Sequence, residues 1–210
     1  MISFSAKDLC VRTCMQLKMF AEHPYMRPKP NFNTEFGETF QHQIATTVKG
    51  LIGEEMRGSY IQDNICINFS NDIVCNDSVI EVKSILDNKT VEDWYFNSAI
   101  TQCAVYKALL EKCGGKLITA TFFAELGHPV IETIVKPDTN YLLRFGEDTY
   151  KIETTNNEKI IDFIIEKAKA TLTWTDAKIF DYQYKHLEYD TLKKYFTYEK
   201  IENFCQSGSN

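Results

Sequence analysis

The stretch NDIVCNDSVIEVKS, residues 71–84, carries Asp72, Glu81 and Lys83 among apolar residues. A turn at Asn76-Asp77 makes this stretch a β-hairpin, since two-residue connections favour Asn and Asp. Antiparallel pairing around that turn sets Asp72 opposite Glu81, and directly opposed side chains project to the same face of a sheet. Lys83 lies two residues beyond Glu81 and is therefore expected on that face too.

Opposed carboxylates of this kind are typical of a divalent metal site. Two facing carboxylates repel, and each raises the pKa of the other unless a cation lies between them. Oxygen ligands are those that Mg²⁺ and Mn²⁺ prefer. A bound metal polarises phosphoryl oxygens and lowers the cost of forming hydroxide, while a neighbouring lysine positions or deprotonates the attacking water. The pattern therefore indicates hydrolysis of a phosphodiester.

A solvated charge cluster on a surface hairpin is the alternative, because exposed acid–base pairs are common and contribute little. The neighbouring apolar side chains favour instead a strand that is buried on both faces: Ile73, Val79, Ile80 and Val82. The Glu-x-Lys triplet at 81–83 also occurs once in the chain. The Asp-x-Lys triplets at 87–89 and 176–178 fall in a predicted turn and a predicted helix.

A long amphipathic helix is expected after the hairpin, opening at Thr90 or Asp93 and ending at Gly114-Gly115. Gln102 and Tyr106 are four residues apart on it and share one face. Taken singly, Gln102 is equally compatible with a buried amide satisfied by the backbone, and Tyr106 with an ordinary core aromatic.

The order and spacing of five residues resemble the PD-(D/E)xK nuclease superfamily: Asp72, Glu81, Lys83, Gln102 and Tyr106. More narrowly, the chain resembles the RecB-type exonuclease branch, which includes the CRISPR adaptation nucleases. The resemblance implies that Asp72 and Glu81 ligate the metal together with the backbone carbonyl of Val82. It also implies that Lys83 is the catalytic lysine, and that Gln102 and Tyr106 support the site and contact the nucleic-acid strand.

The same branch tends to carry a helix with Gly-x-x-x-His, whose imidazole binds the metal. Here Gly37 and His42 are one residue further apart than that spacing. Either His42 is a metal ligand with a shifted glycine, or Gln41 occupies the position and the site has no histidine. An imidazole ligand would favour Mn²⁺ over Mg²⁺. Glu55 is a further candidate acid.

The seven cysteines form no even disulfide framework, and the chain shows neither a signal-peptide core nor a membrane-length apolar run. A cytoplasmic protein with free thiols is expected. Some members of the branch hold an iron–sulfur cluster with one Cys before the core and three after it. Cys14 matches the first, but only Cys205 follows the core, so we expect no iron–sulfur cluster.

The predicted elements define an α/β fold, with a central mixed sheet flanked by helices as in restriction endonucleases. Helices are expected at 5–21 and 35–52, short strands across 56–86 and a strand at 116–126. A hairpin at 140–155 and a helix at 157–172 follow, and the Tyr-rich stretch 176–204 is expected to be helical. We expect residues 1–126 to form the nuclease core with its N-terminal helical segment. Residues 127–210 would add a hairpin and a mainly helical extension packed on the same domain.

The net charge of −6 argues against non-specific coating of nucleic acid, although bound cations supply positive charge in a nuclease. The sequence therefore predicts a DNA exonuclease that uses Mg²⁺ or Mn²⁺ on single strands or duplex ends. No membrane partner is expected. A protein partner from a replication, recombination or CRISPR system is expected. An inert nuclease-fold binding module and a restriction-type endonuclease are the alternatives. Candidate strand contacts are Arg12, Arg27, Lys29 and Arg57, with Tyr25, Tyr60 and Tyr95 as stacking surfaces.

Overall fold

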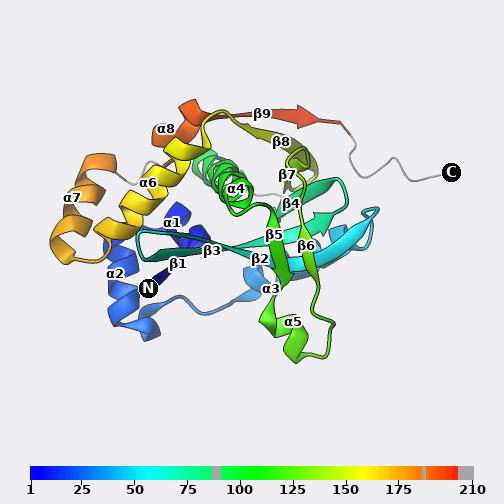
Figure 1. Cartoon of the computed structure of the whole chain (residues 1–210), viewed down its shortest axis with the longest axis horizontal. Helices are drawn as coiled ribbons and strands as arrows, with labels where there is room; N and C mark the ends of the chain where they lie inside the picture. The colour runs from blue at the N-terminus through cyan, green and yellow to red at the C-terminus, as the bar shows by residue number, and fades with distance from the viewer. Residues whose placement is uncertain (87–90, 186–187, 203–210) are drawn as a thin grey trace.

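A single mixed sheet forms the centre of the computed structural model, which describes residues 1–86, 91–185 and 188–202 (Figure 1). Within these ranges the sheet has nine strands in the order β6-β5-β2-β3-β4-β7-β8-β9, and β1 pairs with β3. The strands are β1 (Ile2–Ser5), β2 (Leu51–Gln62), β3 (Ile65–Cys75), β4 (Ser78–Lys83), β5 (Lys116–Thr119), β6 (Glu132–Ile134), β7 (Asn140–Phe145), β8 (Asp148–Thr154) and β9 (Phe196–Ile201). The expected α/β class is thus confirmed.

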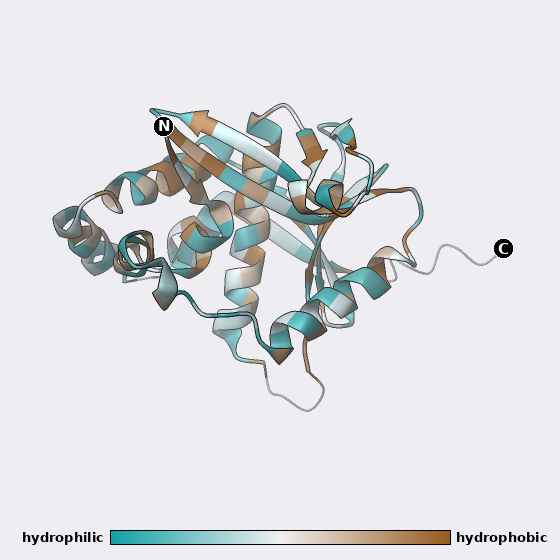
Figure 2. Cartoon of the chain, turned by 90° about the horizontal axis from the view of Figure 1, so that it is seen from below, coloured by the Kyte–Doolittle hydropathy of each residue, from teal (hydrophilic) through white to brown (hydrophobic). Residues whose placement is uncertain are grey.

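Helices cover both faces of this sheet. They are α1 (Ala6–Val11), α2 (Cys14–Glu22), α3 (Phe32–Ala45), α4 (Asp93–Lys112), α5 (Thr121–Glu125), α6 (Asn157–Ala170), α7 (Trp174–Tyr184) and α8 (Glu188–Leu192), with short 3₁₀ turns η1 (Pro24–Met26) and η2 (Lys193–Tyr195). The outer helices carry both hydrophilic and hydrophobic residues, as expected for helices with one buried face (Figure 2).

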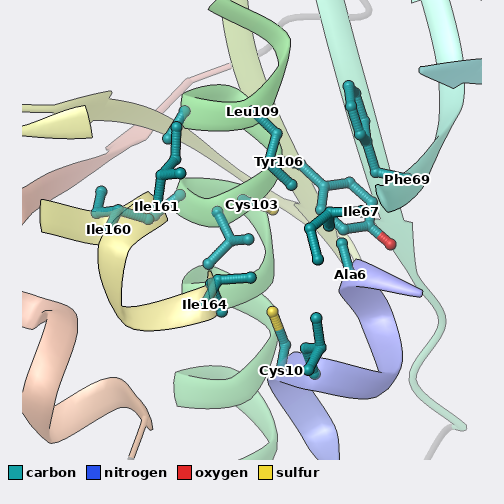
Figure 3. Close-up of a cluster of buried hydrophobic side chains, with 14 of the residues drawn as sticks. Ala6, Cys10, Ile67, Phe69, Cys103, Tyr106, Leu109, Ile160, Ile161 and Ile164 are labelled. Carbon is teal, nitrogen blue, oxygen red and sulfur yellow. The ribbon is translucent and has the colours of Figure 1, made fainter. Parts of the chain in front are cut away.

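The main core lies between the sheet and α4. Figure 3 shows Cys103, Tyr106 and Leu109 of α4 among side chains from β3, α1 and α6. A smaller apolar cluster covers the other side of the central strands, where α3 packs on Ile73 and Ile80. Because α4 is buried along most of its length, it is held rigidly against the strands that carry the candidate site.

Strands on both sides of residue 127 belong to the same sheet. β4 pairs in parallel with β7, and β7 forms the predicted hairpin with β8. The segment after 127 is less helical than expected, because Phe196–Ile201 is strand β9, paired with β8. Only Phe196 of this strand is buried, but Thr197 and Tyr198 are good strand formers and β8 offers a sheet edge to pair with. The helices predicted at 157–172 and around 176 correspond to α6 and α7.

The N-terminal segment is divided where a single helix was expected. β1 pairs with β3 before α1 begins, and Thr13 interrupts the helix between α1 and α2. Thr13 Oγ1 accepts from the backbone N–H of Gln16, and the Gln16 side chain accepts from the N–H of Thr13. This capping box fixes the start of α2 and explains the break.

The second helix is shorter than predicted. The Asn31 side chain caps it by accepting from the backbone N–H groups of Asn33 and Thr34. It ends at Ala45, before the predicted end at residue 52, because the chain continues as strand β2 from Leu51. The helix after the hairpin begins at Asp93; the alternative start at Thr90 and the triplet at 87–89 lie outside the described residues. Over the described ranges, no helix has the length and apolar character needed to cross a membrane.

Candidate active site

The predicted hairpin register is confirmed. Ile73 lies opposite Ile80 and Val74 opposite Val79. Val74 and Val79 pack in the core under α4, whereas the two isoleucines face α3. Because side chains alternate along β4, Glu81 lies on the α4 side, between Ile80 and Val82 of the α3-side cluster, and Asp72 lines the same cleft as Glu81, Gln102 and Tyr106. The acids and α4 thus share one face of the sheet.

Glu81 is the centre of the polar cluster. Its residue is only 2% exposed. Its Oε1 accepts hydrogen bonds from Lys83 Nζ at 2.6 Å and from Gln102 Nε2 at 2.7 Å. Its Oε2 is buried and has no hydrogen-bond partner among the described residues. A buried carboxylate oxygen without a donor is costly, so this atom calls for a partner outside the chain.

Asp72 lies beside Glu81 and bonds across the hairpin. Its Oδ2 accepts from the backbone N–H of Val82 at 2.7 Å. A residue in an antiparallel ladder presents its N–H and C=O to the same neighbour, so the Val82 carbonyl also faces β3. Burial raises the pKa of the Asp72 carboxyl well above its usual range, and the negative charge of Glu81 raises it further. The two acids therefore form the mutually repelling pair that the sequence indicates.

Lys83 supplies the positive charge next to this pair. Burial alone would lower the pKa of its ammonium group, but the Glu81 and Asp72 carboxylates raise it above its ordinary value. Lys83 is therefore protonated here and acts as a hydrogen-bond donor. Its side chain is 15% exposed, which leaves the ammonium within reach of a ligand.

Gln102 and Tyr106 stand on the face of α4 that covers the acids. Tyr106 is buried, with its ring centroid 5.9 Å from that of Phe69 on β3. Burial raises the pKa of its phenol well above the usual value, and Glu81 raises it further. Gly58 makes room for this contact, because a Cβ there would lie 2.4 Å from the Phe69 ring.

These side chains line one cleft of about 410 Å³. Six predicted site residues contribute to it: Asp72, Glu81, Val82, Lys83, Gln102 and Tyr106. Residues from α1 and α3 complete the walls, among them Lys7 and Gln41. The structure thus brings together residues that are far apart in the sequence and come from both flanking layers.

Gln41 and Glu55 join the site through a hydrogen-bond chain. Gln41 Nε2 donates to Glu55 Oε1 at 2.9 Å and to the backbone carbonyl of Asp72 at 3.3 Å. Ser70 Oγ donates to the other oxygen of Glu55 at 3.0 Å. Glu55 has φ of +51°, a left-handed conformation that is uncommon for this residue type and is found most often at functional sites.

His42 does not reach the site, and the expectation that it is a ligand is corrected here. Its side chain is 69% exposed, and Nδ1 lies 3.1 Å from Glu54 Oε1 on the surface. Successive residues on a helix project about 100° apart, so a helix that turns Gln41 into the cleft turns His42 away from it. Of the two alternatives left by the sequence, the structure places Gln41 at the cleft.

Several expected strand contacts have other partners. Arg12 and Arg27 both pair with Asp8, and both guanidinium groups lie over the ring of Phe20. They hold the loop after α2 and line neither side of the cleft. Tyr95 does line the cleft. Lys7 was missed because an isolated lysine in a predicted helix carries no signal.

The fit to a divalent cation rests on oxygen donors. Nowhere in the ranges that the structure describes do three or more His, Cys, Asp or Glu side chains gather closely enough to hold a metal. Two carboxylates and one backbone carbonyl remain, at Asp72, Glu81 and Val82. The unpartnered Glu81 Oε2 and the raised pKa of Asp72 are what a missing cation would leave behind. The donor set suits Mg²⁺ or Mn²⁺.

Comparisons with known proteins bear on the fold of the chain and not on its activity. No protein-family model and no curated protein matches the sequence. The solved structure titled "Crystal structure of SSO0001" is similar, with a TM-score of 0.50 over 80% of this chain and 76% of that one. The two sequences are 13% identical. At this identity the likeness supports an α/β fold and says nothing about activity.

Proposed function

We propose that this protein is a divalent-metal-dependent deoxyribonuclease of the PD-(D/E)xK superfamily, similar to its RecB-type branch, and that it acts as an exonuclease. The observation that carries the proposal is the environment of Glu81. One oxygen of this buried carboxylate accepts hydrogen bonds from Lys83 and Gln102. The other oxygen has no partner among the described residues. A purely structural ion pair gains nothing from that arrangement, because an unpartnered buried oxygen destabilises the fold.

Asp72, Glu81 and the carbonyl of Val82 would hold the Mg²⁺ or Mn²⁺ ion. When bound, such an ion polarises a phosphoryl oxygen and makes hydroxide available near neutral pH. Removing water from the cleft would strengthen every one of these electrostatic interactions.

The chain's own residues would then orient the attacking water and stabilise the negative charge that develops on the phosphate. Lys83, as a protonated ammonium, donates to the attacking water or to the phosphate oxygen on which negative charge develops. Gln102 fixes the orientation of the Glu81 carboxylate, as outer partners of ligands do in other sites. Tyr106 closes the α4 side of the cleft and excludes water. Gln41 and Glu55 hold the backbone at Asp72.

The deciding experiment offers end-labelled linear and closed circular DNA, single- and double-stranded, with Mg²⁺, Mn²⁺ or a chelator. We expect linear substrates to be shortened from their ends with metal and left intact with chelator. Closed circles should persist; their cleavage would indicate a restriction-type endonuclease instead. Glu81→Gln keeps the side-chain shape, and its activity should be lost. An active Glu81→Gln protein would overturn the proposed site.

An inert nuclease-fold module that binds nucleic acid or protein is the second candidate. It is favoured by the lack of a three-ligand side-chain group in the described ranges and by the net charge of −6. Wild-type protein that binds DNA or a protein but cleaves none of the substrates in Mg²⁺ or Mn²⁺ would support it.

A further inference from the structure

A second hollow of about 440 Å³ adjoins the candidate active site. It lies between α1, the first half of α4 and α8, and it shares four lining residues with the cleft: Lys7, Lys83, Tyr95 and Gln102. Because the same side chains line both, the two hollows are neighbouring parts of one surface. The volume falls within the roughly 300–1,000 Å³ typical of small-ligand sites.

Trp94 leaves a large aromatic ring open at this hollow. It is 65% exposed in the first turn of α4, whose buried residues begin at Ala99. Its indole N–H donates to the Glu92 carboxylate, and its ring centroid lies 5.9 Å from that of Tyr95. The Tyr95 hydroxyl in turn donates to the carbonyl of Ser84, the residue after Lys83, at 3.5 Å. The exposed ring is therefore tied to the strand that carries the candidate site.

The acids at this hollow are neutralised, whereas Lys7 is not. Glu188 pairs with the buried Lys167, and Asp190 pairs with Lys193. Lys7 lines both hollows, and no described residue forms an ion pair or hydrogen bond with its ammonium group. A near-neutral, partly aromatic hollow with a free cation at its junction with the cleft suits a nucleotide, whose base is planar and whose phosphate is anionic.

We propose that the second hollow is a nucleobase subsite for single-stranded DNA, next to the phosphodiester at Glu81. Trp94 stacks on the base, and Lys7 binds the phosphate that joins this nucleotide to the one in the cleft. The inference rests on the proposed nuclease function. It deepens that function by selecting an unpaired strand, because a base inside a duplex has no free face to stack on a protein ring.

The chain contains two tryptophans, which allows a direct test by fluorescence. Trp174 begins α7 and lines neither hollow, so it provides the matched control. A thymidine oligonucleotide is titrated into Trp174→Phe, which keeps Trp94, and into Trp94→Phe, which keeps Trp174. Titrations use chelator and, separately, Ca²⁺, which takes oxygen ligands as Mg²⁺ does. Binding is followed in parallel by anisotropy of a labelled oligonucleotide.

We expect the oligonucleotide to quench Trp94 fluorescence in Trp174→Phe and to leave Trp174 unchanged in Trp94→Phe. Trp94→Ala should bind the single strand roughly 5- to 150-fold more weakly, given the usual strength of base stacking. Binding of blunt duplex should change little. An oligonucleotide that binds without quenching Trp94, or that does not bind at all, would refute the subsite.

Lys7 is tested by the salt dependence of the same binding. Loss of one phosphate contact lowers the slope of log K against log salt by about 0.7 for a single strand. Lys7→Ala should show this change, and Lys159→Ala, an exposed lysine of α6 outside both hollows, should not. An unchanged slope in Lys7→Ala would remove Lys7 from the subsite.

The two proposals fail separately. Cleavage of DNA without Trp94 quenching would leave the nuclease and refute the subsite. Trp94 quenching without cleavage in any metal would keep the subsite and identify the protein as the inert binding module.

Discussion

Gln102 on α4 donates a hydrogen bond of 2.7 Å to Glu81 on β4, across 21 residues of sequence. This contact joins the helix that covers the cleft to the strand that carries the acid. Its acceptor is the same oxygen that accepts from Lys83, so the second oxygen of Glu81 is left buried without a hydrogen-bond partner among the described residues. Gln102 thereby determines which oxygen of Glu81 a cation could reach.

Replacing Gln102 with alanine should therefore weaken metal use before it harms the fold. Losing an outer hydrogen-bond partner of a ligand typically costs roughly 10- to 100-fold in metal affinity or activity. Glu81 Oε1 keeps the hydrogen bond from Lys83, so the loss of one hydrogen bond to a charged group should destabilise the fold by about 1.5–3 kcal/mol. Cleavage rate against metal concentration and urea unfolding measure the two effects. Gln43→Ala, an exposed glutamine on the neighbouring α3, is the matched control and should change neither. Equal activity of the two variants would contradict the role assigned to Gln102.

Lys83→Met should abolish cleavage and make the fold depend on divalent cations. Removing one partner of a buried ion pair leaves an uncompensated charge and costs about 3–5 kcal/mol. A cation bound at Asp72 and Glu81 replaces the missing positive charge, so Mg²⁺ or Mn²⁺ should raise the melting temperature of Lys83→Met more than that of wild type. Differential scanning calorimetry with and without chelator measures this. Lys18→Met, which breaks the surface pair with Glu22, should lower stability by about 1 kcal/mol or less and respond to metal like wild type.

The neighbours Gln41 and His42 give a prediction in which adjacent residues should behave oppositely. Gln41→Ala breaks the chain from α3 to Glu55 and to the backbone of Asp72, so the cleavage rate should fall. His42→Ala removes only a surface contact with Glu54 and should leave the rate and the preference between Mg²⁺ and Mn²⁺ unchanged. Rates measured across a titration of each metal separate the two variants. A loss of Mn²⁺-dependent activity in His42→Ala would restore His42 as a ligand.

The hairpin was predictable because every local signal agreed. Its turn residues and its apolar neighbours specify one register, and a slip by one residue would have put Asp72 and Glu81 on opposite faces. The choice between Gln41 and His42 could not be made from sequence, since both lie on one helical turn and only the packing of α3 decides which one faces the cleft. The sequence offered little evidence for Glu55 and none for Lys7 as site residues. Their positions depend on strands and helices that come together only in the folded chain.

The errors at the two ends of the chain have a related cause. The first helix was read through Thr13, whose capping role is decided by the side chain of Gln16. β9 was read as helix because its aromatic residues follow a helical segment, yet β8 offers it an unpaired sheet edge. A specific hydrogen-bonding partner overrides helix propensity in both places: Gln16, three residues away, at Thr13, and strand β8, distant in sequence, at β9.

The cysteine thiols provide a prediction that does not depend on nuclease activity. Burial raises the pKa of Cys10 to about 12, and burial raises that of Cys14 to about 11. Cys14 Sγ also donates to the carbonyl of Lys167 at 3.6 Å. Only the thiolate reacts with alkylating agents, so both residues should resist iodoacetamide near neutral pH in the folded protein and react once it is unfolded in urea. Peptide mapping by mass spectrometry reads each site separately.

The half-buried Cys113 at the end of α4 is the internal comparison. It should react before Cys10 and Cys14, because those two thiols are buried and the reagent cannot reach them easily. Burial raises the pKa of the Cys113 thiol as well, so its modification should accelerate as the pH rises, and its greater exposure should let it react first. Rapid modification of Cys10 in folded protein would mean that α1 opens away from α4. Because residues of α1 and α4 line both hollows, such opening would also change the hollows that Lys7 and Lys83 line.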